Sequence, residues 1–263
     1  MQNNTIDIEV CEGLVVKRTI KEIISERMNP RIWQWAYLSL RALLREVKIF
    51  SGMLERERAE KILDLGCGVK PYRSLFPEVK AYVGFDVSKN SSADFFGYNW
   101  DLPFGESEFD ALISTQVLEH TSKISETIKE IGRVVKNDGL IFISAPLAFP
   151  EHEIPHDYYR FTQYGLRELF KGFEVIRIVP LSGYIKTLII LWNNFLHYLP
   201  GSKYWLSPLF IINNLLALVI DNVALLVSSM SSKMSGGAVI KEIYAKYYAS
   251  FTESYVIVLR NKK

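Results

Sequence analysis

The chain has 263 residues, of which 49% are hydrophobic and 23% are charged, so it can bury a sizeable core and does not have the composition of a disordered protein. Lys and Arg together number 31 and Asp and Glu together number 29, which gives a net charge of +2. Binding to nucleic acid requires a concentrated basic surface, which so small a net charge does not supply, so we expect no nucleic-acid partner. The two cysteines, Cys11 and Cys67, and a start without a basic or apolar leader predict a cytoplasmic protein without a disulfide framework.

Residues 1–59 are predicted to form an N-terminal helical cap. From about residue 14 onward, apolar residues such as Ile32 and Leu43 recur at helical spacing. Pro30 stands where the first turn of a helix tolerates a proline. We interpret the segment as an amphipathic helix that covers a sheet, and a lid or a membrane-surface contact is the alternative.

Residues 60–183 alternate between short apolar runs and helical stretches. Most of the runs are rich in β-branched or aromatic residues, and helical stretches such as residues 123–135 lie between them. Strand and helix in alternation are typical of a parallel sheet with helices on both faces, which places the chain in the α/β class. The predicted strands are residues 61–65, 81–86, 109–113, 140–144 and 173–178.

Residues 184–252 are predicted to form an apolar helical insert before a final strand in residues 253–263. Asp221 is the only charged residue between positions 204 and 232, but polar residues and a proline interrupt the apolar stretches, so we expect no transmembrane helix. We expect residues 184–232 either to form a homodimer or buried cap, or to contact a membrane peripherally. An interfacial rim for membrane contact would consist of Trp192, Tyr198, Tyr204, Trp205, Lys186 and Lys203.

The sharpest motif is the segment Asp64-Leu65-Gly66-Cys67-Gly68, at the end of the first core strand. Its glycines allow a tight turn and let a ligand approach the backbone. We expect the helix that follows to point its N-terminal amides at the same place. Asp86 ends the next strand, where a carboxylate can hold the paired hydroxyls of a ribose.

Two classes of cofactor use such a turn. A dinucleotide fingerprint has a third glycine, which is missing here because Val69, Lys70 and Pro71 follow Gly68. The acid before the glycines, Asp64, suits a ligand with a cationic segment, and S-adenosylmethionine carries both an amino group and a sulfonium. A nicotinamide-dependent oxidoreductase and an ordinary strand–turn–helix connection are the alternatives.

The same segment resembles motif I of the class I S-adenosylmethionine-dependent methyltransferases. Further matches make the set similar to the small-molecule "type 11" branch over residues 61–183, and they lie at residues 82–86, 101–110, 116–120 and 131–139. The resemblance implies S-adenosylmethionine as the cofactor and a Rossmann-like, doubly wound, mostly parallel sheet of seven strands, the last of them antiparallel.

The resemblance also assigns positions to the cofactor. It places the glycine turn at the methionine part, Asp86 at the ribose, and Phe85 or Val87 near the adenine. Asp101, or Asn99 in its place, would bind the adenine amino group. The full set of implied cofactor residues is Asp64, Gly66, Cys67, Gly68, Asp86, Val87, Asp101, Leu102, Thr115 and Gln116, the last two beside the sulfonium.

Residues 150–162, after the fifth predicted strand, supply candidates for the acceptor side. A hydroxyl acceptor attacks better when a base takes its proton, and His156 beside Asp157 is the predicted base, with His120 as a further catalytic candidate. The substrate-binding candidates are His152, Tyr158 and Arg160.

The alternative interpretation is that this loop has no chemical role and is a hydrogen-bonded connection that ends on Thr162 as a helix cap. We assign no metal ligands, because the spacing of its histidines and glutamates, Glu151, His152, Glu153 and His156, does not by itself demand a metal.

Residues 156–162, His-Asp-Tyr-Tyr-Arg-Phe-Thr, resemble a bacterial methyltransferase subgroup associated with glycan and cell-envelope biosynthesis. We therefore expect methyl transfer to an oxygen of a small-molecule or lipid-linked glycan acceptor, in the cytoplasm or at the inner face of the membrane. The alternatives are an NAD-dependent oxidoreductase and a non-catalytic, membrane-associated protein that retains the cofactor fold.

Overall fold

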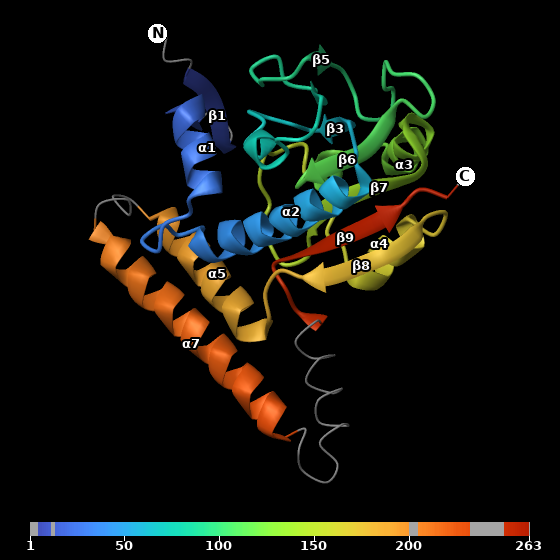
Figure 1. Ribbon diagram of the computed structural model, residues 1–263. Helices are drawn as coiled ribbons and strands as arrows, with labels where there is room; N and C mark the ends of the chain where they lie inside the picture. The colour runs from blue at the N-terminus through green and yellow to red at the C-terminus, as the bar shows by residue number, and fades with distance from the viewer. Residues whose placement is uncertain (1–4, 12–13, 200–204, 232–249, 263) are drawn as a thin grey trace.

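One seven-stranded sheet forms the centre of the molecule in the computed structural model, which describes residues 5–11, 14–199, 205–231 and 250–262 (Figure 1). The strand order is β5-β4-β3-β6-β7-β9-β8, and the sheet is the predicted Rossmann-like, mostly parallel one. Its strands are β3 (Lys61–Leu65), β4 (Ala81–Asp86), β5 (Phe95–Phe96), β6 (Phe109–Thr115), β7 (Val135–Pro146), β8 (Glu174–Pro180) and β9 (Ser254–Arg260).

The last strand is antiparallel, as expected. β9 lies between β7 and β8 and pairs with both in the antiparallel sense. Ser254 at its start is opposite Pro146, so the beginning of β9 lies at the carboxyl edge of the parallel strands. β9, the last strand in the sequence, therefore fills the position between β7 and the edge strand β8.

The strand order reverses between β3 and β6. The chain runs outward from β3 to β4 and β5, and then returns to the other side of β3 with β6 and β7. In an open parallel sheet, ligands bind at the carboxyl ends of the strands where the order reverses. Here that place is formed by the residues after Leu65 and Thr115.

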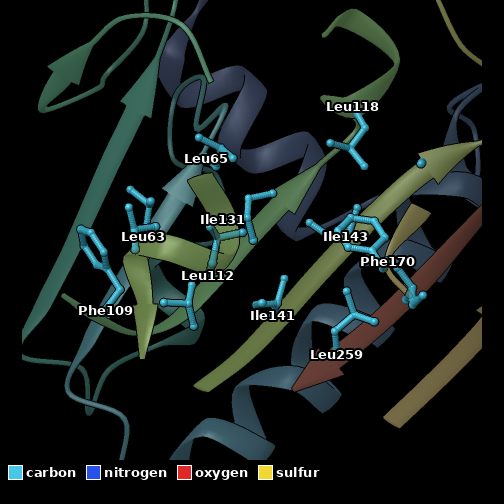
Figure 2. Packing of buried hydrophobic residues seen from close by; sticks show 14 of the residues in the cluster. Leu63, Leu65, Phe109, Leu112, Leu118, Ile131, Ile141, Ile143, Phe170 and Leu259 are labelled. Atoms are coloured by element: carbon cyan, nitrogen blue, oxygen red, sulfur yellow. The ribbon is translucent and has the colours of Figure 1, made fainter. Parts of the chain in front are cut away.

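Helices cover both faces of the sheet (Figure 1). Alternate residues of a strand point to opposite faces, and Ile62 packs with α2 (Tyr37–Glu57) whereas Leu63 packs with α3 (Ile124–Val134). Figure 2 shows the buried cluster on the face of the sheet that α3 covers. Its labelled residues are Leu63, Leu65, Phe109, Leu112, Leu118, Ile131, Ile141, Ile143, Phe170 and Leu259. Phe170 directly follows the short helix α4 (Gln163–Leu169).

The N-terminal cap is only partly helical. β1 (Thr5–Cys11) and β2 (Leu14–Thr19) form an antiparallel hairpin, so the prediction of helix from about residue 14 was wrong up to residue 19. Val15 and Val16 favour a strand. The first helix, α1 (Ile20–Met28), begins after Thr19, whose side chain accepts the Glu22 N–H while the Glu22 carboxylate accepts the Thr19 N–H.

The helix expected after the glycine turn is absent from the described residues. The segment contains one three-residue 3₁₀ helix, η1 (Arg73–Leu75), before β4 begins. Pro71 disfavours helical backbone at Lys70, and Pro77 follows six residues later, so there is room for a single turn. The turn therefore has no helix N-terminus to offer a ligand.

The insert is helical where it is described. α5 (Tyr184–His197) and α7 (Ser207–Ser231) lie side by side and extend away from the sheet (Figure 1). Residues 200–204, with the predicted rim residues Lys203 and Tyr204, and residues 232–249 lie outside the described part of the chain. No described helix is long and apolar enough to cross a membrane.

Buried amides attach the insert to the N-terminal cap. Asn214 of α7 is fully buried, and its Nδ2 donates to the backbone carbonyl oxygens of Ile32, at 2.8 Å, and Gln34, at 3.0 Å. The Nδ2 of Asn193 on α5 donates to Asn214 Oδ1 at 3.0 Å. One side chain thus connects three segments that are far apart in the sequence.

We expect Asn214→Ala to lower the free energy of unfolding by about 3 kcal/mol, because it leaves buried hydrogen-bonding groups without partners. Urea unfolding followed by circular dichroism measures the change. The neighbouring Leu215→Ala is the control, since Leu215 is 48% exposed and its truncation should cost less than about 1 kcal/mol. Equal losses in the two variants would contradict the assignment of Asn214 as the anchor.

Candidate functional site

The glycine turn after β3 has the conformation that its sequence predicts. Gly66 has φ +71° and Gly68 has φ +50°, both in the left-handed region. A Cβ atom at position 66 would clash with the Val117 side chain, so this glycine is required for packing. A Cβ atom at position 68 would meet nothing within 4 Å. The backbone of Gly68 therefore faces open space into which a ligand can move.

Asp86 lies directly beside this turn. Its carboxylate accepts the Gly68 N–H at Oδ2 and the Ser88 N–H at Oδ1, both at 2.8 Å. A carboxylate oxygen can accept more than one hydrogen bond, so Asp86 can hold the turn and still accept ribose hydroxyls. The structure thus brings together Gly68 and Asp86, two of the residues that the sequence assigned to the cofactor.

A salt bridge ties the turn to the edge of the sheet. Lys70, two residues after Gly68, has φ +52° and places Nζ 2.6 Å from Asp94 Oδ2. Asp94 in turn accepts the Gly84 N–H at 2.7 Å. Lys70 therefore has a structural role that the sequence alone did not indicate.

Asp64 is buried beneath the turn. Its side chain accepts a hydrogen bond from the Tyr82 hydroxyl at 2.7 Å, and only 4% of the residue is exposed. Burial raises the pKa of Asp64 to about 7, and the Tyr82 hydrogen bond only partly opposes this rise. A cationic ligand group placed nearby would favour the charged carboxylate.

Cys67 can contribute only through its backbone. The residue is buried, and burial raises the pKa of its thiol, so the side chain is not a reactive thiolate. The Cys67 N–H donates to the Phe85 carbonyl oxygen at 3.1 Å, which fixes the turn against β4.

Thr115 and Gln116 end β6 on the other side of the strand-order reversal. Gln116 has φ +55°, and its side-chain Nε2 donates to Ser144 Oγ at 3.0 Å. Its backbone N–H also points at Ser144, to the carbonyl oxygen and to Oγ, both at 3.1 Å. The bend after β6 is therefore fixed by β7. The position of Thr115 and Gln116 beside the sulfonium, which the family resemblance implies, stays a prediction.

The residues expected around an adenine are unequally placed. Phe85 is completely buried in the core, whereas Val87 is 62% exposed, so of these two only Val87 is open to a ligand. Asp101 is exposed, but Leu102 is buried and donates its N–H to Glu130 Oε2 at 2.9 Å. Leu102 therefore positions this loop and can reach a ligand only through its backbone.

The loop after β7 is organised differently from the sequence expectation. Asp157 does not pair with His156; its carboxylate binds Arg160 through two hydrogen bonds of 2.6 and 2.7 Å. Burial alone would raise the pKa of Asp157, but hydrogen bonds, first of all from Arg160, lower it to about 2. The Arg160 guanidinium, and not the His156 ring, binds this carboxylate, because the guanidinium and the carboxylate form a bidentate pair.

Arg160 is occupied by the same loop. Besides Asp157, it donates to the carbonyl oxygens of Phe149, Pro150 and Tyr159, at 2.8 to 3.0 Å. These bonds use all five N–H donors of a guanidinium. Arg160 therefore holds the loop together, and its predicted role in binding the acceptor stays a prediction.

His156 and Tyr158 are two exposed polar residues of the loop that lie next to each other. His156 Nδ1 lies 3.0 Å from the Tyr158 hydroxyl, and both side chains are exposed. The imidazole is therefore oriented by a phenol rather than by the expected carboxylate. The role of His156 as a base stays a prediction.

His120 and His152 meet although 32 positions separate them. His120 follows β6 in the 3₁₀ helix η2 (Leu118–His120), and its Nε2 lies 3.2 Å from Nε2 of His152. Burial, and then the nearby His120, lower the pKa of His152.

The sequence analysis missed Glu119, which is completely buried beside this histidine pair. Burial raises its pKa to about 8. In the sequence it looks like an ordinary surface acid between Leu118 and His120, and no local signal marks it as buried.

Comparisons with known proteins agree with this geometry. A family described as "Methyltransferase domain" matches residues 34–184, more than half of the chain. Among solved structures, the [4+2]-cyclase SpnF is 18% identical, with a TM-score of 0.51 and coverage of 83% of this chain and 82% of that chain. A putative sarcosine dimethylglycine methyltransferase from Galdieria sulphuraria is 16% identical, with a TM-score of 0.50 and coverage of 85% and 88%. No curated protein matches.

We expect Asp64→Asn to stabilise the ligand-free protein above neutral pH. Because the folded-state pKa of Asp64, about 7, exceeds the unfolded value, the folded state binds the proton more tightly, and stability falls as the pH rises from about 4 to 7. The neutral amide removes this dependence and still accepts the Tyr82 hydrogen bond. The stability difference should grow by about 2 kcal/mol between pH 5 and pH 8 in urea unfolding, and a pH-independent difference would contradict the assignment.

Proposed function

The chain belongs to the methyltransferase domain family, and from this premise we propose that it transfers a methyl group to an oxygen of a sugar, a glycan or another small envelope-related acceptor. The family and the fold establish the general class, an S-adenosylmethionine-dependent methyltransferase. The acceptor and its oxygen atom are the proposed part.

The described residues fit the cofactor. The open space beside Gly68 allows a ligand to approach the backbone, and Asp86 is bound to the same turn with lone pairs left for hydroxyl groups. Asp64 lies beneath the turn and can balance a cationic amino group. When bound there, S-adenosylmethionine supplies an electrophilic methyl group on a sulfonium. The adjacency of Gly68 and Asp86 is the observation that carries the proposal.

An oxygen acceptor needs a group that takes its proton. His156 is the exposed imidazole of the loop after β7, and its ring nitrogen would accept that proton as the acceptor oxygen bonds to the methyl carbon and the bond from this carbon to sulfur breaks, which leaves a neutral thioether. Its hydrogen-bond distance of 3.0 Å from the Tyr158 hydroxyl supports a defined ring orientation. Tyr158 is then placed to contact the acceptor.

We expect the purified protein to transfer tritium from labelled S-adenosylmethionine into a sugar or lipid-linked glycan extract of bacterial envelopes. Alkali-stable label that is released as methylated sugar on acid hydrolysis would support O-methylation. Label on nitrogen, or in protein alone, would contradict the proposed acceptor while leaving the general class intact.

Asp86→Ala is the matching control for this transfer. It removes the acceptor of the Gly68 N–H and the proposed ribose ligand, so calorimetric affinity for S-adenosylhomocysteine should fall at least tenfold, about 1.4 kcal/mol, and transfer should fall with it. Asp86→Asn keeps one acceptor oxygen and should lose less. Unchanged affinity in Asp86→Ala would remove Asp86 from the cofactor site.

The helical insert supports an acceptor that is linked to a lipid. α5 and α7 expose large apolar side chains, among them Trp192 at 51%, Phe195 at 55% and Leu216 at 50%. Exposed apolar patches of this kind mark membrane or protein contacts. We favour a membrane surface as the partner of this patch, because aromatic residues suit the bilayer interface and a lipid-linked acceptor is found there. A second copy of the chain, in a homodimer, is the alternative.

We expect the full-length protein to float with anionic liposomes, and Trp192→Glu to reduce the floating fraction by at least about half, because a charge at this position opposes insertion. Tyr164→Glu is the control, since Tyr164 is 72% exposed on α4 and lies outside the insert. If wild type and variant stay equally in the soluble fraction while light scattering gives twice the monomer mass, the surface is a dimer interface instead.

A further inference from the structure

We propose that Glu119, His120 and His152 bind one divalent transition-metal ion of the zinc type, with an open coordination position for the acceptor oxygen. Their ligand atoms all lie within 4.8 Å of one another. The metal site stands on this chain's own geometry; only the statement about the acceptor oxygen rests on the proposed function.

The hydrogen bonds of the two imidazoles leave their Nε2 lone pairs facing each other. His120 Nδ1 lies 2.8 Å from the carbonyl oxygen of His156, and His152 Nδ1 lies 3.2 Å from that of Pro150. A carbonyl oxygen only accepts, so each Nδ1 carries the proton of its neutral ring. Two lone pairs at 3.2 Å repel each other unless a cation lies between them.

The spacing suits a tetrahedral metal. Two nitrogens that each lie about 2.05 Å from a tetrahedral zinc ion are about 3.3 Å apart, and the observed separation is 3.2 Å. The Nδ1–H bonds to backbone carbonyls are also the outer contacts that usually orient histidine ligands of metals. In the case of His152, the Asp157 carboxylate lies 3.3 Å from the same Nδ1 and supports this orientation.

Glu119 supplies an independent sign of a missing ligand. The residue is completely buried, and neither of its carboxylate oxygens has a hydrogen-bond partner. Buried carboxylates are normally paired or bound to a metal. Glu119 Oε1 lies 4.0 Å from His120 Nε2, so the carboxylate must move slightly toward the imidazoles on binding. Glu153 Oε2 lies 3.8 Å from the same nitrogen on the exposed side.

The chemistry and position of the donors identify the class of metal and its use. Two imidazoles and one carboxylate are a ligand set that borderline cations such as Zn²⁺ prefer, and a set of three protein ligands leaves a fourth position for an exchangeable oxygen. Glu119 is only three residues beyond Gln116, at the end of β6 where the methyl donor is expected. An acceptor hydroxyl bound to the metal would lose its proton more readily.

We expect the full-length protein to bind one equivalent of Co²⁺ with the visible absorption of a tetrahedral site, and Zn²⁺ to displace it. Glu119→Gln and His152→Gln should each weaken binding at least about tenfold, because each removes a ligand. His197→Gln is the matched control. His197 is not one of the three proposed ligands and stacks on Trp35, so its substitution should leave Co²⁺ binding unchanged. If Glu119→Gln fails to fold in thermal melting, His120→Gln replaces it.

Calorimetry with S-adenosylhomocysteine on the same samples separates this proposal from the proposed function. Retained S-adenosylhomocysteine binding without Co²⁺ or Zn²⁺ binding would overturn the metal site and leave a proton shared between the two imidazoles. Metal binding that survives in both ligand variants would also overturn it, because the ion would lie elsewhere. Specific metal binding in a protein without affinity for S-adenosylhomocysteine would support the site and contradict the proposed function.

Discussion

The hydrogen bond between the Gly68 N–H and the Asp86 carboxylate connects the carboxyl ends of β3 and β4, and the cofactor site that we propose depends on it. The bond fixes a glycine turn that no helix follows, and so it does the positioning for which related sheets use a helix N-terminus. Because Gly68 has no side chain, the same turn stays open to a ligand, whereas Gly66 is closed off by Val117. Gly66 thus allows close packing against Val117, and Gly68 leaves the turn accessible to a ligand.

Buried polar side chains hold the remaining parts in place. Asn214 fastens the insert to the N-terminal cap, and the paired charges of Asp157 and Arg160 fasten the loop after β7. Both contacts take polar or charged groups out of water, and such groups are stable there only when each has a hydrogen-bonding partner. The carboxylate of Glu119 departs from this requirement, because it is completely buried and neither of its oxygens has a hydrogen-bond partner, whereas the buried Asp64 accepts a hydrogen bond from a hydroxyl.

The outward surface of the insert, in contrast, is apolar and exposed. α5 and α7 pack on each other and on the cap with one side, through Ile190, Ala217 and Leu38, while large apolar side chains stay exposed on the other. A second layer of protein or a bilayer surface would remove that area from water.

Hydrophobic periodicity and turn residues act over a few positions, so the sequence by itself determined most strands of the large sheet and the glycine turn, although it missed β1, β2 and β5. The antiparallel sense of the last strand was implied by the family resemblance and is confirmed. The sequence also determined Thr162 as the cap of α4. Only the tertiary structure decided which polar groups meet: Asp157 with Arg160 instead of His156, and Glu119 with two histidines from different loops. These pairings depend on how loops at one sheet edge approach each other and on which groups lose contact with water, and spacing along a single chain encodes neither.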